Sequence, residues 1–419
     1  MNKSYDVEIE ILTPVHIGDG NNISGIDYIC YHEQIKDKKD KKNRFDRVYK
    51  SYLYKYNLSG VIDFLDEGDR EEVLELLNNS DIIKLRNKIW YLLKDKENDE
   101  YKKRLERERE KEKENKSYKK PEYKLVRYEK SKYKDRFIKI AEKPIEVSNK
   151  FFEDYIKKMS QKGKQINGKN EKKKENEEIN QISQLIIQSF IKSVGRVYIP
   201  GSSLKGAIRT VLTNNEIENI STEKDPFKKL IVRDSDFIDD GIEIGPLARK
   251  SKKSKDENGE INGDGNYAEF LKPGIKINTK IVLKGFLDES NLEKIDISKD
   301  NILKASNNYT KNKIKNYIEK LYQLKNLDNN NKEKNQKIET TIKSFDKILK
   351  KGLNENECIL NIGFGGGFWF KSFEGNEKHP GKIHFEKYKN KDIVIPTTNY
   401  NTKLENTDLE NLGFIKLTF

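Results

Sequence analysis

The sequence is short of cysteine and of apolar residues, and it has no long apolar run. Cys30 and Cys358 are its only cysteines and form no CxxC pair, which excludes a disulfide framework and a cysteine zinc site. We expect each to be a small core residue. No stretch approaches the roughly 18 apolar residues of a membrane span, and residues 1–10 lack a signal-peptide core. These absences predict a cytoplasmic protein with no membrane partner.

Charged residues are abundant instead. The 419 residues include 83 Lys and Arg against 70 Asp and Glu, a net charge of +13, and 37% are charged against 34% hydrophobic. This composition predicts two or three domains with long solvated segments, and the positive excess favours a polyanionic partner. Much of the charge lies in mixed Lys/Glu runs at 102–120 and 164–178, which are typical of solvated faces.

The apolar pattern predicts a mixed chain of strands and helices. Alternation over 6–12 predicts a strand with Val7, Ile9 and Ile11 on one face, followed by a turn-rich loop at 13–25. Further strands are expected at 26–31, 229–237, 275–287 and 358–362. Helical spacing is found at 58–114 and 309–349, the latter interrupted near Asn329. We expect a loop or disordered linker at 157–180, a buried helix or strand at 182–197, and a polar loop at 251–265.

The segment YIPGSSLKGAIRTVL, residues 198–212, carries the most chemistry. Pro200 and Gly201 end the preceding element, and Ser202 and Ser203 are natural N-cap residues for a following helix. Free N–H groups at such a helix start, with two hydroxyls beside them, would bind an anion such as phosphate. The sequence therefore predicts a phosphate site here.

Two cations extend this hypothesis. Lys205 and Arg209 are four residues apart, so they share one helix face and could contact an adjacent phosphate. The segment is not a P-loop, because Gly206 is followed by Ala207 and not by Lys. An ordinary capped helix with two surface cations explains the pattern equally well.

A glycine-rich segment, GFGGGFWF, follows at 363–370. Its glycines, Gly363, Gly365, Gly366 and Gly367, allow a close backbone approach to a ligand, and its aromatic residues offer faces for base stacking. A dinucleotide fingerprint is excluded, because GxGxxG would need glycine at Phe368. For Trp369 and Phe370 we favour packing in a core over base stacking.

These motifs together resemble the RAMP proteins of CRISPR–Cas systems. The resemblance is carried by TPVHIGDG at 13–20, IPGSSLKGAIRT at 199–210, IVRDSD at 231–236 and GFGGGF at 363–368. The chain length, the helical insertions and the HIGDG form are similar to one member, the type III-A (Csm) subunit that caps the backbone filament at the crRNA 3′ end. The motifs cover about a tenth of the chain.

The resemblance implies a fold and a division of the chain. It implies an α+β fold with a modified RRM (ferredoxin-like) core and large helical insertions. Its five expected segments are the first core strands at 1–50, a helical and low-complexity insertion at 51–181, a central core with the GSSLKG motif at 182–300, a helical segment at 301–357, and a C-terminal strand with the glycine-rich loop at 358–419.

The resemblance also implies a role. The chain would be a crRNA-binding structural subunit without a cofactor, needed for crRNA maturation and antiviral defence. Its implied partners are crRNA and other Csm subunits, in particular the repeated RAMP backbone subunit and the small helical subunit, with target RNA contacted indirectly. The implied RNA-binding positions are His16, Gly201, Ser202, Ser203, Lys205, Arg209, Gly363, Gly365, Gly366 and Gly367. For His16 we favour a hydrogen-bonded ring in a turn over direct RNA contact.

Asp27 is the candidate for catalysis. The related repeated subunit, which cuts target RNA, carries an Asp in a similar GID context, and a carboxylate there could hold Mg²⁺. Tyr28 and Ile29 depart from the residues that continue that loop, so the sequence favours a non-catalytic chain. Asp19 is a second possible ligand, and we interpret it as a turn residue.

Two alternatives remain open. One is a metal-independent RAMP-fold endoribonuclease that processes CRISPR repeat RNA, whose chemistry usually needs histidine. The histidines available are His16, His32, His379 and His384. The other is a nucleic-acid module outside CRISPR with no assembly partner. A cyclase and a DNase are excluded, because the sequence has neither a GGDD motif nor a His-Asp dyad.

Overall fold

A computed structural model describes the chain in two compact units. Unit 1 comprises residues 1–22 and 186–419, and unit 2 comprises residues 23–185. The structure describes residues 2–35, 48–80, 82–97, 128–160, 186–213, 225–249, 267–285, 295–327, 332–364, 385–387, 394–396, 400–402 and 410–419. Within those ranges no helix combines the length and the apolar character needed to cross a membrane.

Unit 1 contains a sheet with the strand order β11-β15-β1-β21-β16. Its strands are β1 (Lys3–Ile11), β11 (Leu230–Val232), β15 (Lys276–Leu283), β16 (Glu357–Asn361) and β21 (Phe414–Thr418). Every pairing is antiparallel, so β1 and β11 run parallel to one another on either side of β15. Strands far apart in sequence are therefore interleaved, and the sheet holds the two ends of the chain side by side.

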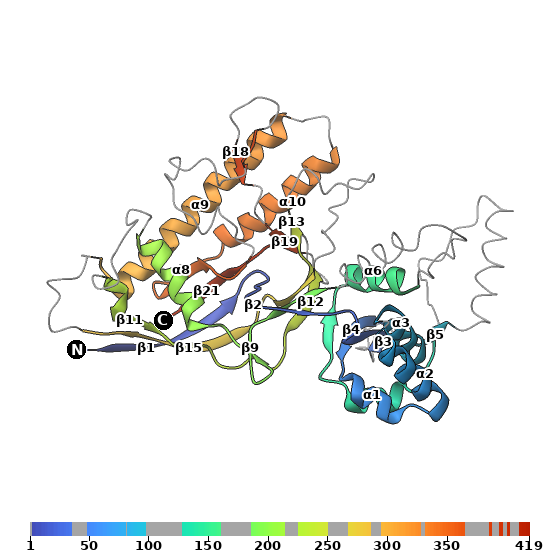
Figure 1. The fold of residues 1–419 in the computed structure, drawn as a ribbon. Helices are drawn as coiled ribbons and strands as arrows, with labels where there is room; N and C mark the ends of the chain where they lie inside the picture. Colours follow the sequence, from blue (N-terminus) through green and yellow to red (C-terminus); the bar gives the residue numbers. More distant parts are fainter. Residues whose placement is uncertain are drawn as a thin grey trace, which may run out of the picture. The chain divides into compact units, whose positions relative to one another are not determined.

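Two helices cover one face of this sheet. The strand alternation places Val7, Ile9 and Ile11 on that face, where they pack with α8 (Gly201–Thr213) and the start of α9 (Lys299–Leu327). Figure 1 shows both helices above β1 and β15. From α8 the core takes Leu204, Ile208 and Val211, which recur at helical spacing. Burial of this apolar stripe stabilises the helix on the sheet.

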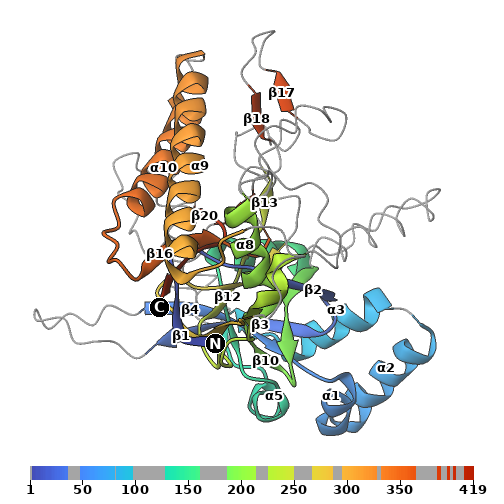
Figure 2. The same cartoon turned by 90° about the vertical axis from the view of Figure 1, so that its left-hand side faces the viewer.

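The far half of α9 pairs with α10 (Lys332–Leu349) over the β16 side of the sheet. Tyr317 of α9 meets Phe345 of α10 edge-on at 5.3 Å between ring centroids, and Phe345 in turn contacts Phe414 of β21 at 6.1 Å. Figure 2 shows the two helices side by side. These contacts form a second core beside the first.

Helix α9 also closes the outer edge of β16. The side chain of Asn307 accepts from the N–H of Ile359 at 3.1 Å and donates to the carbonyl oxygen of Glu357 at 3.0 Å. Thr310 donates to the carbonyl oxygen of Ile359 at 2.8 Å. Side chains of a helix therefore satisfy backbone groups that would otherwise be unpaired at a sheet edge.

The remaining strands of unit 1 lie beside this core. The order β2-β8-β14-β12 joins β2 (Gly18–Ile23), β8 (Ile187–Phe190), β14 (Tyr267–Leu271) and β12 (Ile242–Pro246). A short hairpin, β9 (Lys192–Ser193) with β10 (Arg196–Val197), leads from β8 to α8. Smaller elements are η2 (Pro226–Lys229), β13 (Ala248–Arg249), β17 (Phe385–Lys387), β18 (Val394–Pro396), β19 (Tyr400–Thr402) and β20 (Glu410–Asn411).

Unit 2 consists of antiparallel strands with helices around them. Its strands are β3 (Tyr28–Ile35), β4 (Val48–Lys55) and β7 (Ile145–Val147), in the order β3-β4-β7, with a small pair β5 (Lys96–Glu97) and β6 (Tyr128–Glu129). Its helices are α1 (Leu58–Phe64), α2 (Glu67–Asn78), α3 (Ile82–Leu93), α5 (Lys134–Ile140) and α6 (Asn149–Ser160). A buried cluster joins α1, α2, α3 and α5 to β3 and β4.

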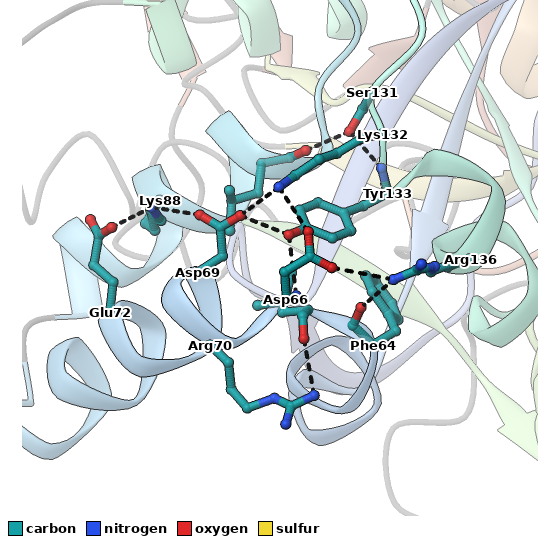
Figure 3. Close-up of polar contacts among 12 residues, drawn as sticks. Phe64, Asp66, Asp69, Arg70, Glu72, Lys88, Ser131, Lys132, Tyr133 and Arg136 are labelled. Carbon is teal, nitrogen blue, oxygen red and sulfur yellow. Dashed lines mark hydrogen bonds and ion pairs between the residues drawn. The ribbon is translucent and has the colours of Figure 1, made fainter.

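An ion-pair network links the helices of unit 2, as Figure 3 shows. Asp69 of α2 accepts from the hydroxyl of Tyr133 at 2.7 Å and pairs with Lys132 at 3.0 Å and with Lys88 of α3 at 3.2 Å. The guanidinium of Arg70 donates to carbonyl groups at the end of α1, which caps that helix. Through its contacts with Tyr133 and Lys132, Asp69 therefore connects α2 to the loop before α5.

The structure confirms the mixed α+β character and most of the predicted elements. The strands at 6–12, 275–287 and 358–362 are present as β1, β15 and β16, and Cys30 and Cys358 are buried as expected. Helical spacing at 58–114 corresponds to α1, α2 and α3, and that at 309–349 to α9 and α10. The division into five segments by sequence character stays a prediction.

Several boundaries were wrong. The loop predicted at 13–25 contains β2, a polar strand that forms because it pairs with β8. The predicted linker at 157–180 begins inside α6, which packs through buried Met159. The strand expected at 229–237 ends at Val232, and α9 begins at Lys299 rather than Tyr309. The short strand β5 follows α3, and the part of the helical block predicted beyond residue 97 lies outside the described residues. The polar loop expected at 251–265 and both mixed-charge runs lie outside the described residues.

Candidate functional site

Three motifs that are distant in sequence line one pocket of about 730 Å³ in unit 1. His16, Ile17, Gly18 and Gly20 come from the HIGDG motif, Ser203, Gly206, Ala207 and Thr210 from the GSSLKG motif, and Gly363 and Phe364 from the start of the glycine-rich segment. The α8 residues recur at i, i+3, i+4 and i+7, so they form one stripe of the helix. Strands β2, β8 and β16 and helix α9 complete the wall. The structure thus brings together motifs that the sequence could only show separately.

The start of α8 is held by the IVRDSD motif. The N–H of Gly201 donates to Asp234 Oδ1 at 2.8 Å, and the N–H of Ile199 donates to Ser235 Oγ at 2.8 Å. A Cβ atom at Gly201 would lie 2.2 Å from the carbonyl oxygen of Val232, so only glycine fits there. The prediction that Ser202 and Ser203 are N-cap residues was wrong, because α8 already begins at Gly201. A phosphate at the Gly201 N–H would compete with the Asp234 carboxylate.

Lys205 and Arg209 lie outside the described wall of the pocket. Arg209 pairs with Asp225 at 2.8 Å, and its guanidinium lies over the ring of Phe227 at 5.1 Å. Lys205 has no ion-pair partner among the described residues. Residues four apart on α8 share one helix face, and the face of Lys205 and Arg209 is not the stripe that lines the pocket. Ser202 is exposed and Ser203 reaches the wall.

His16 lies in the pocket wall and is almost completely buried, with 1% of its surface exposed. Its Nδ1 is 2.8 Å from the carbonyl oxygen of Glu269, and its ring meets Phe190, Phe270 and Phe364 edge-on. Burial lowers the pKa of His16 below its ordinary value, so the ring is neutral near pH 7. The hydrogen bond agrees with the structural interpretation made from the sequence.

Glu269, whose carbonyl oxygen contacts His16, also has a buried side chain. The carboxylate of Glu269 is fully buried and accepts from Lys192 Nζ at 2.8 Å and from the N–H of Phe190 at 2.8 Å. A buried carboxylate is tolerated when it is paired and hydrogen-bonded, as this one is. The pair fixes β14 against the segment after β8, and through the Glu269 carbonyl it fixes the ring of His16.

The first glycine of GFGGGF is structurally required. Gly363 has φ +69°, and a Cβ atom there would lie 2.4 Å from the carbonyl oxygen of His16. The N–H of Phe364 donates to that same oxygen at 2.7 Å, and 39% of the Phe364 surface is exposed. The other predicted glycines, Gly365, Gly366 and Gly367, lie outside the described residues, as do Trp369 and Phe370.

Of the two acidic candidates, Asp27 lies in a turn and Asp19 in strand β2. Asp27 in unit 2 is exposed, and its carboxylate accepts from the N–H of Ser24 at 3.2 Å. Asp19 accepts from the N–H of Asn21 at 2.8 Å but lies within strand β2, so its interpretation as a turn residue was wrong. Among the described residues no group of three or more His, Cys, Asp or Glu side chains is placed to hold a metal ion.

The other histidines of the sequence lie outside the pocket wall or outside the described residues. His32 in unit 2 contacts Ser51 Oγ through Nδ1 at 2.9 Å and stacks on Phe152, and burial lowers its pKa. His379 and His384 lie outside the described residues. Histidine is the most frequent general base or acid, so these positions are the histidine candidates for RNA cleavage.

Several pocket residues were missed by sequence reasoning. Asn361, at the end of β16, and Tyr309 and Thr310 on α9 line the wall, and Gln188 and Ser189 enter it from β8. Nothing in their local sequence sets them apart, because they reach the pocket only through long-range strand pairing. Asp234 belongs to the IVRDSD motif, but its contact with Gly201 depends on the fold.

The chain is similar in sequence to a known protein. No protein-family model matches the chain. Over 255 residues the chain is 28% identical to the CRISPR system protein Csm5 of Methanocaldococcus jannaschii, an alignment that covers 52% of this chain and 56% of that relative. The chain resembles Csm5. The match spans about half the length of this curated relative, and it confirms the resemblance to a type III-A Csm subunit.

A solved structure agrees with this chain at the level of the fold. A protein chain in the cryo-EM structure of a Csm–crRNA–target RNA ternary complex of a type III-A CRISPR–Cas system has a TM-score of 0.51 at 17% identity, covering 100% of both chains. The crystal structure of T. onnurineus Csm5 has a TM-score of 0.44 at 14% identity, covering 97% of this chain and 99% of that one. The similarity in fold therefore rests on the chain of the ternary complex.

Proposed function

We propose that this chain is a non-enzymatic, crRNA-binding subunit that caps the crRNA 3′ end of a type III-A Csm complex. The observation that carries the proposal is the convergence of HIGDG, GSSLKG and the start of GFGGGF on one pocket. The similarity to Csm5 and to a chain of a Csm–crRNA–target RNA complex supports the partner class, crRNA with other Csm subunits. Such an assembly would be cytoplasmic, and target RNA would be met through it.

The strand order supports a ferredoxin-like, RRM-type core. β1, α8 and β11 come in this order along the chain, with other elements inserted between β1 and α8, and β15 lies between the two parallel strands. β15, α9 and β21 are arranged in the same way around β1, with other elements inserted between α9 and β21. Two such interleaved split βαβ units are typical of that core. β16 and α10 would then be additions to it. In this view the sheet positions the HIGDG, GSSLKG and GFGGGF motifs around one pocket.

The absence of catalysis is part of the proposal. Asp27 is a single exposed carboxylate bound to a turn N–H, whereas Mg²⁺ bound to protein needs further oxygen ligands. We assign the regular cuts in target RNA to the repeated RAMP backbone subunit. The competing function, a RAMP-fold endoribonuclease for repeat RNA, usually relies on a reactive histidine, and His16, the histidine in this pocket, is buried and fixed by Glu269.

Site-specific crosslinking tests the proposal. A Csm complex is reconstituted with crRNA that carries one 4-thiouridine near the 3′ end, irradiated, and analysed by mass spectrometry of crosslinked peptides. We expect crosslinks to peptides containing residues 16–22, 203–211 or 361–364. The control carries the label near the 5′ end and should not label this chain. Absence of any crosslink from the 3′ label would overturn the capping role.

A second assay separates the competing function. The chain alone is incubated with CRISPR repeat RNA in the presence of EDTA, and the products are separated on a sequencing gel. We expect intact RNA. A discrete product ending in a 2′,3′-cyclic phosphate would establish the endoribonuclease instead.

A further inference from the structure

The hairpin of β9 and β10 departs from ordinary turn chemistry at its tip. Its two loop residues, Val194 and Gly195, have φ +49° and φ +76°, and positive φ at both positions is what a type I′ turn requires. The pair that suits this turn best is Asn-Gly, whereas a β-branched residue is strained at positive φ. Val194 therefore occupies a conformation that asparagine would adopt more easily.

Packing within the described structure does not compensate this strain, because 96% of the Val194 surface is exposed. The base of the hairpin, in contrast, is fixed: Lys192 pairs with buried Glu269 at 2.8 Å, and Val197 forms a backbone bridge with Ile238. Figure 1 shows β9 on the side of unit 1 away from α9 and α10. A rigid hairpin thus presents a strained apolar residue to solvent, and such strain tends to cluster at ligand contacts.

Two rings and a guanidinium group form an exposed surface beside the tip. The rings of Tyr198 and Phe237 meet edge-on at 6.3 Å between centroids, and the guanidinium of Arg196 lies over the Phe237 ring at 4.5 Å. Asp239 accepts from Nε and Nη2 of Arg196 at 3.1 and 3.2 Å, which orients that group. Phe237 is still 44% exposed. We call Val194, Arg196, Tyr198 and Phe237 the hairpin surface.

The residue types of the hairpin surface favour a protein partner. Aromatic side chains and arginine are enriched at protein interfaces and supply most of their binding energy. The local charge agrees with this: residues 193–196 and 233–240 contain four aspartates against two arginines, although the whole chain has a net charge of +13. Phosphates would be repelled here, since surfaces that bind nucleic acid are strongly positive. The local charge is complementary to a partner surface with basic residues.

We propose that the hairpin surface docks on another protein subunit of the Csm complex, at an apolar pocket bordered by basic residues. Val194 enters this pocket, while Phe237 and Tyr198 pack against its border and the aspartates face the basic residues. Because the base of the hairpin is already rigid, little conformational entropy is lost on docking. The inference rests on the proposed function, because it names a surface through which this chain joins its protein partners.

Val194→Asn separates a docking role from a structural one. Asparagine suits the turn better than valine, so the variant should unfold at a higher urea concentration than the wild type. Loss of the apolar side chain should at the same time weaken docking by about tenfold or more. Docking is measured as the affinity of the fluorescently labelled full chain for a subcomplex of crRNA with the remaining Csm subunits. A purely structural residue would not move the two measurements in opposite directions.

A second variant and two controls define the surface. Phe237→Ser removes another exposed apolar group and should weaken docking by a similar factor. Ser80→Asn introduces asparagine at a positive φ in unit 2, +53°, and Tyr322→Ser removes an exposed ring from α9. Both controls should dock like the wild type, and urea denaturation checks that each variant folds. Wild-type affinity of both Val194→Asn and Phe237→Ser would overturn the inference.

Crosslinking identifies the class of partner. A diazirine amino acid replaces Ser193, which is exposed in β9 next to Val194, and the reconstituted complex is irradiated, digested and analysed by mass spectrometry. We expect a crosslink to a peptide of another Csm subunit. A crosslink to RNA instead, or none, would overturn the inference and leave the proposed function intact. Failure of the wild-type chain to bind the subcomplex would contradict the proposed function, and the inference with it.

Discussion

The N–H of Phe364 donates a 2.7 Å hydrogen bond to the carbonyl oxygen of His16, which joins the last motif of the sequence to the first. The contact is short because Gly363, with φ +69°, lets the chain turn directly against that carbonyl group. The pocket therefore depends on a backbone contact between segments from opposite ends of the chain.

Gly363→Ala should break this junction. The new methyl group would lie 2.4 Å from the His16 oxygen, and alanine is strained at positive φ. We expect a loss of about 1–3 kcal/mol in the free energy of unfolding, together with weaker RNA retention. Urea denaturation checks the first and filter binding the second. Gly352→Ala is the control, since nothing lies within 4 Å of its Cβ position. Equal stability of both variants would contradict the role of Gly363.

Lys205→Ala should reduce the salt dependence of RNA binding. Lys205 has no ion-pair partner among the described residues, so its charge is available to a phosphate, and each contact with a single strand contributes about 0.7 to the slope of log K against log salt. Affinity should fall without sequence preference. Titrations at several salt concentrations measure the slope, and an unchanged slope would remove Lys205 from the interface.

Arg209→Ala should behave differently. Its guanidinium is already paired with Asp225 at 2.8 Å and lies over Phe227, so its loss frees a carboxylate near the helix. We expect a further decrease of the slope by at most about 0.7, and a stability change below about 1 kcal/mol because the pair is half-exposed. The Arg209→Lys variant keeps the charge and should restore the slope. If it does not, phosphate contact is not the role of Arg209.

Asp27→Ala should leave target-RNA cleavage by the assembled complex unchanged at every regular position. The carboxylate accepts from the N–H of Ser24, so its removal disturbs a turn rather than a metal site. In contrast, a complex assembled without this chain should have altered crRNA 3′ ends. Sequencing gels of both preparations make the comparison. Loss of a single discrete cut with Asp27→Ala would show that this subunit is a nuclease.

Asp69→Asn should lower the stability of unit 2 near neutral pH and leave it almost unchanged near pH 2. Its hydrogen bond from Tyr133 and its pairs with Lys132 and Lys88 lower the pKa of Asp69 from 3.8 to about 2. A lowered pKa stabilises the fold above pH 3.8, and this stabilisation is lost as the pH falls through about 2. Because Lys132 is exposed and solvent screens the network, we expect a contribution of at most about 2 kcal/mol near pH 7.

Denaturant melts of this variant at pH 7 and at pH 2 provide the measurement. The wild type and Asp69→Asn should differ at pH 7 and converge toward pH 2. Glu72→Gln is the matched control, because Glu72 also pairs with Lys88 but is 55% exposed and should contribute less than about 1 kcal/mol. A constant difference between Asp69→Asn and the wild type at both pH values would exclude titration of Asp69 as the cause.

Local pattern predicted α8 and β1 well, because Leu204, Ile208 and Val7 recur with the period of their own element. It failed for β2, whose polar residues form a strand only through pairing with β8. The candidate site shows the same limit. His16 and Gly363 were visible as motif residues, whereas Asn361 reaches the pocket because β16 pairs with β21, a contact that no local spacing encodes.

Asn307 holds the backbone of β16 as a neighbouring strand would. An exposed edge offers alternating N–H and C=O groups to any extended peptide, and this is a common route both to strand addition between subunits and to aggregation. With Asn307 and Thr310 in place, the stretch from Glu357 to Ile359 cannot accept a foreign strand. A partner that approaches this edge must therefore recognise the surface of α9, and the chain is protected against self-association there.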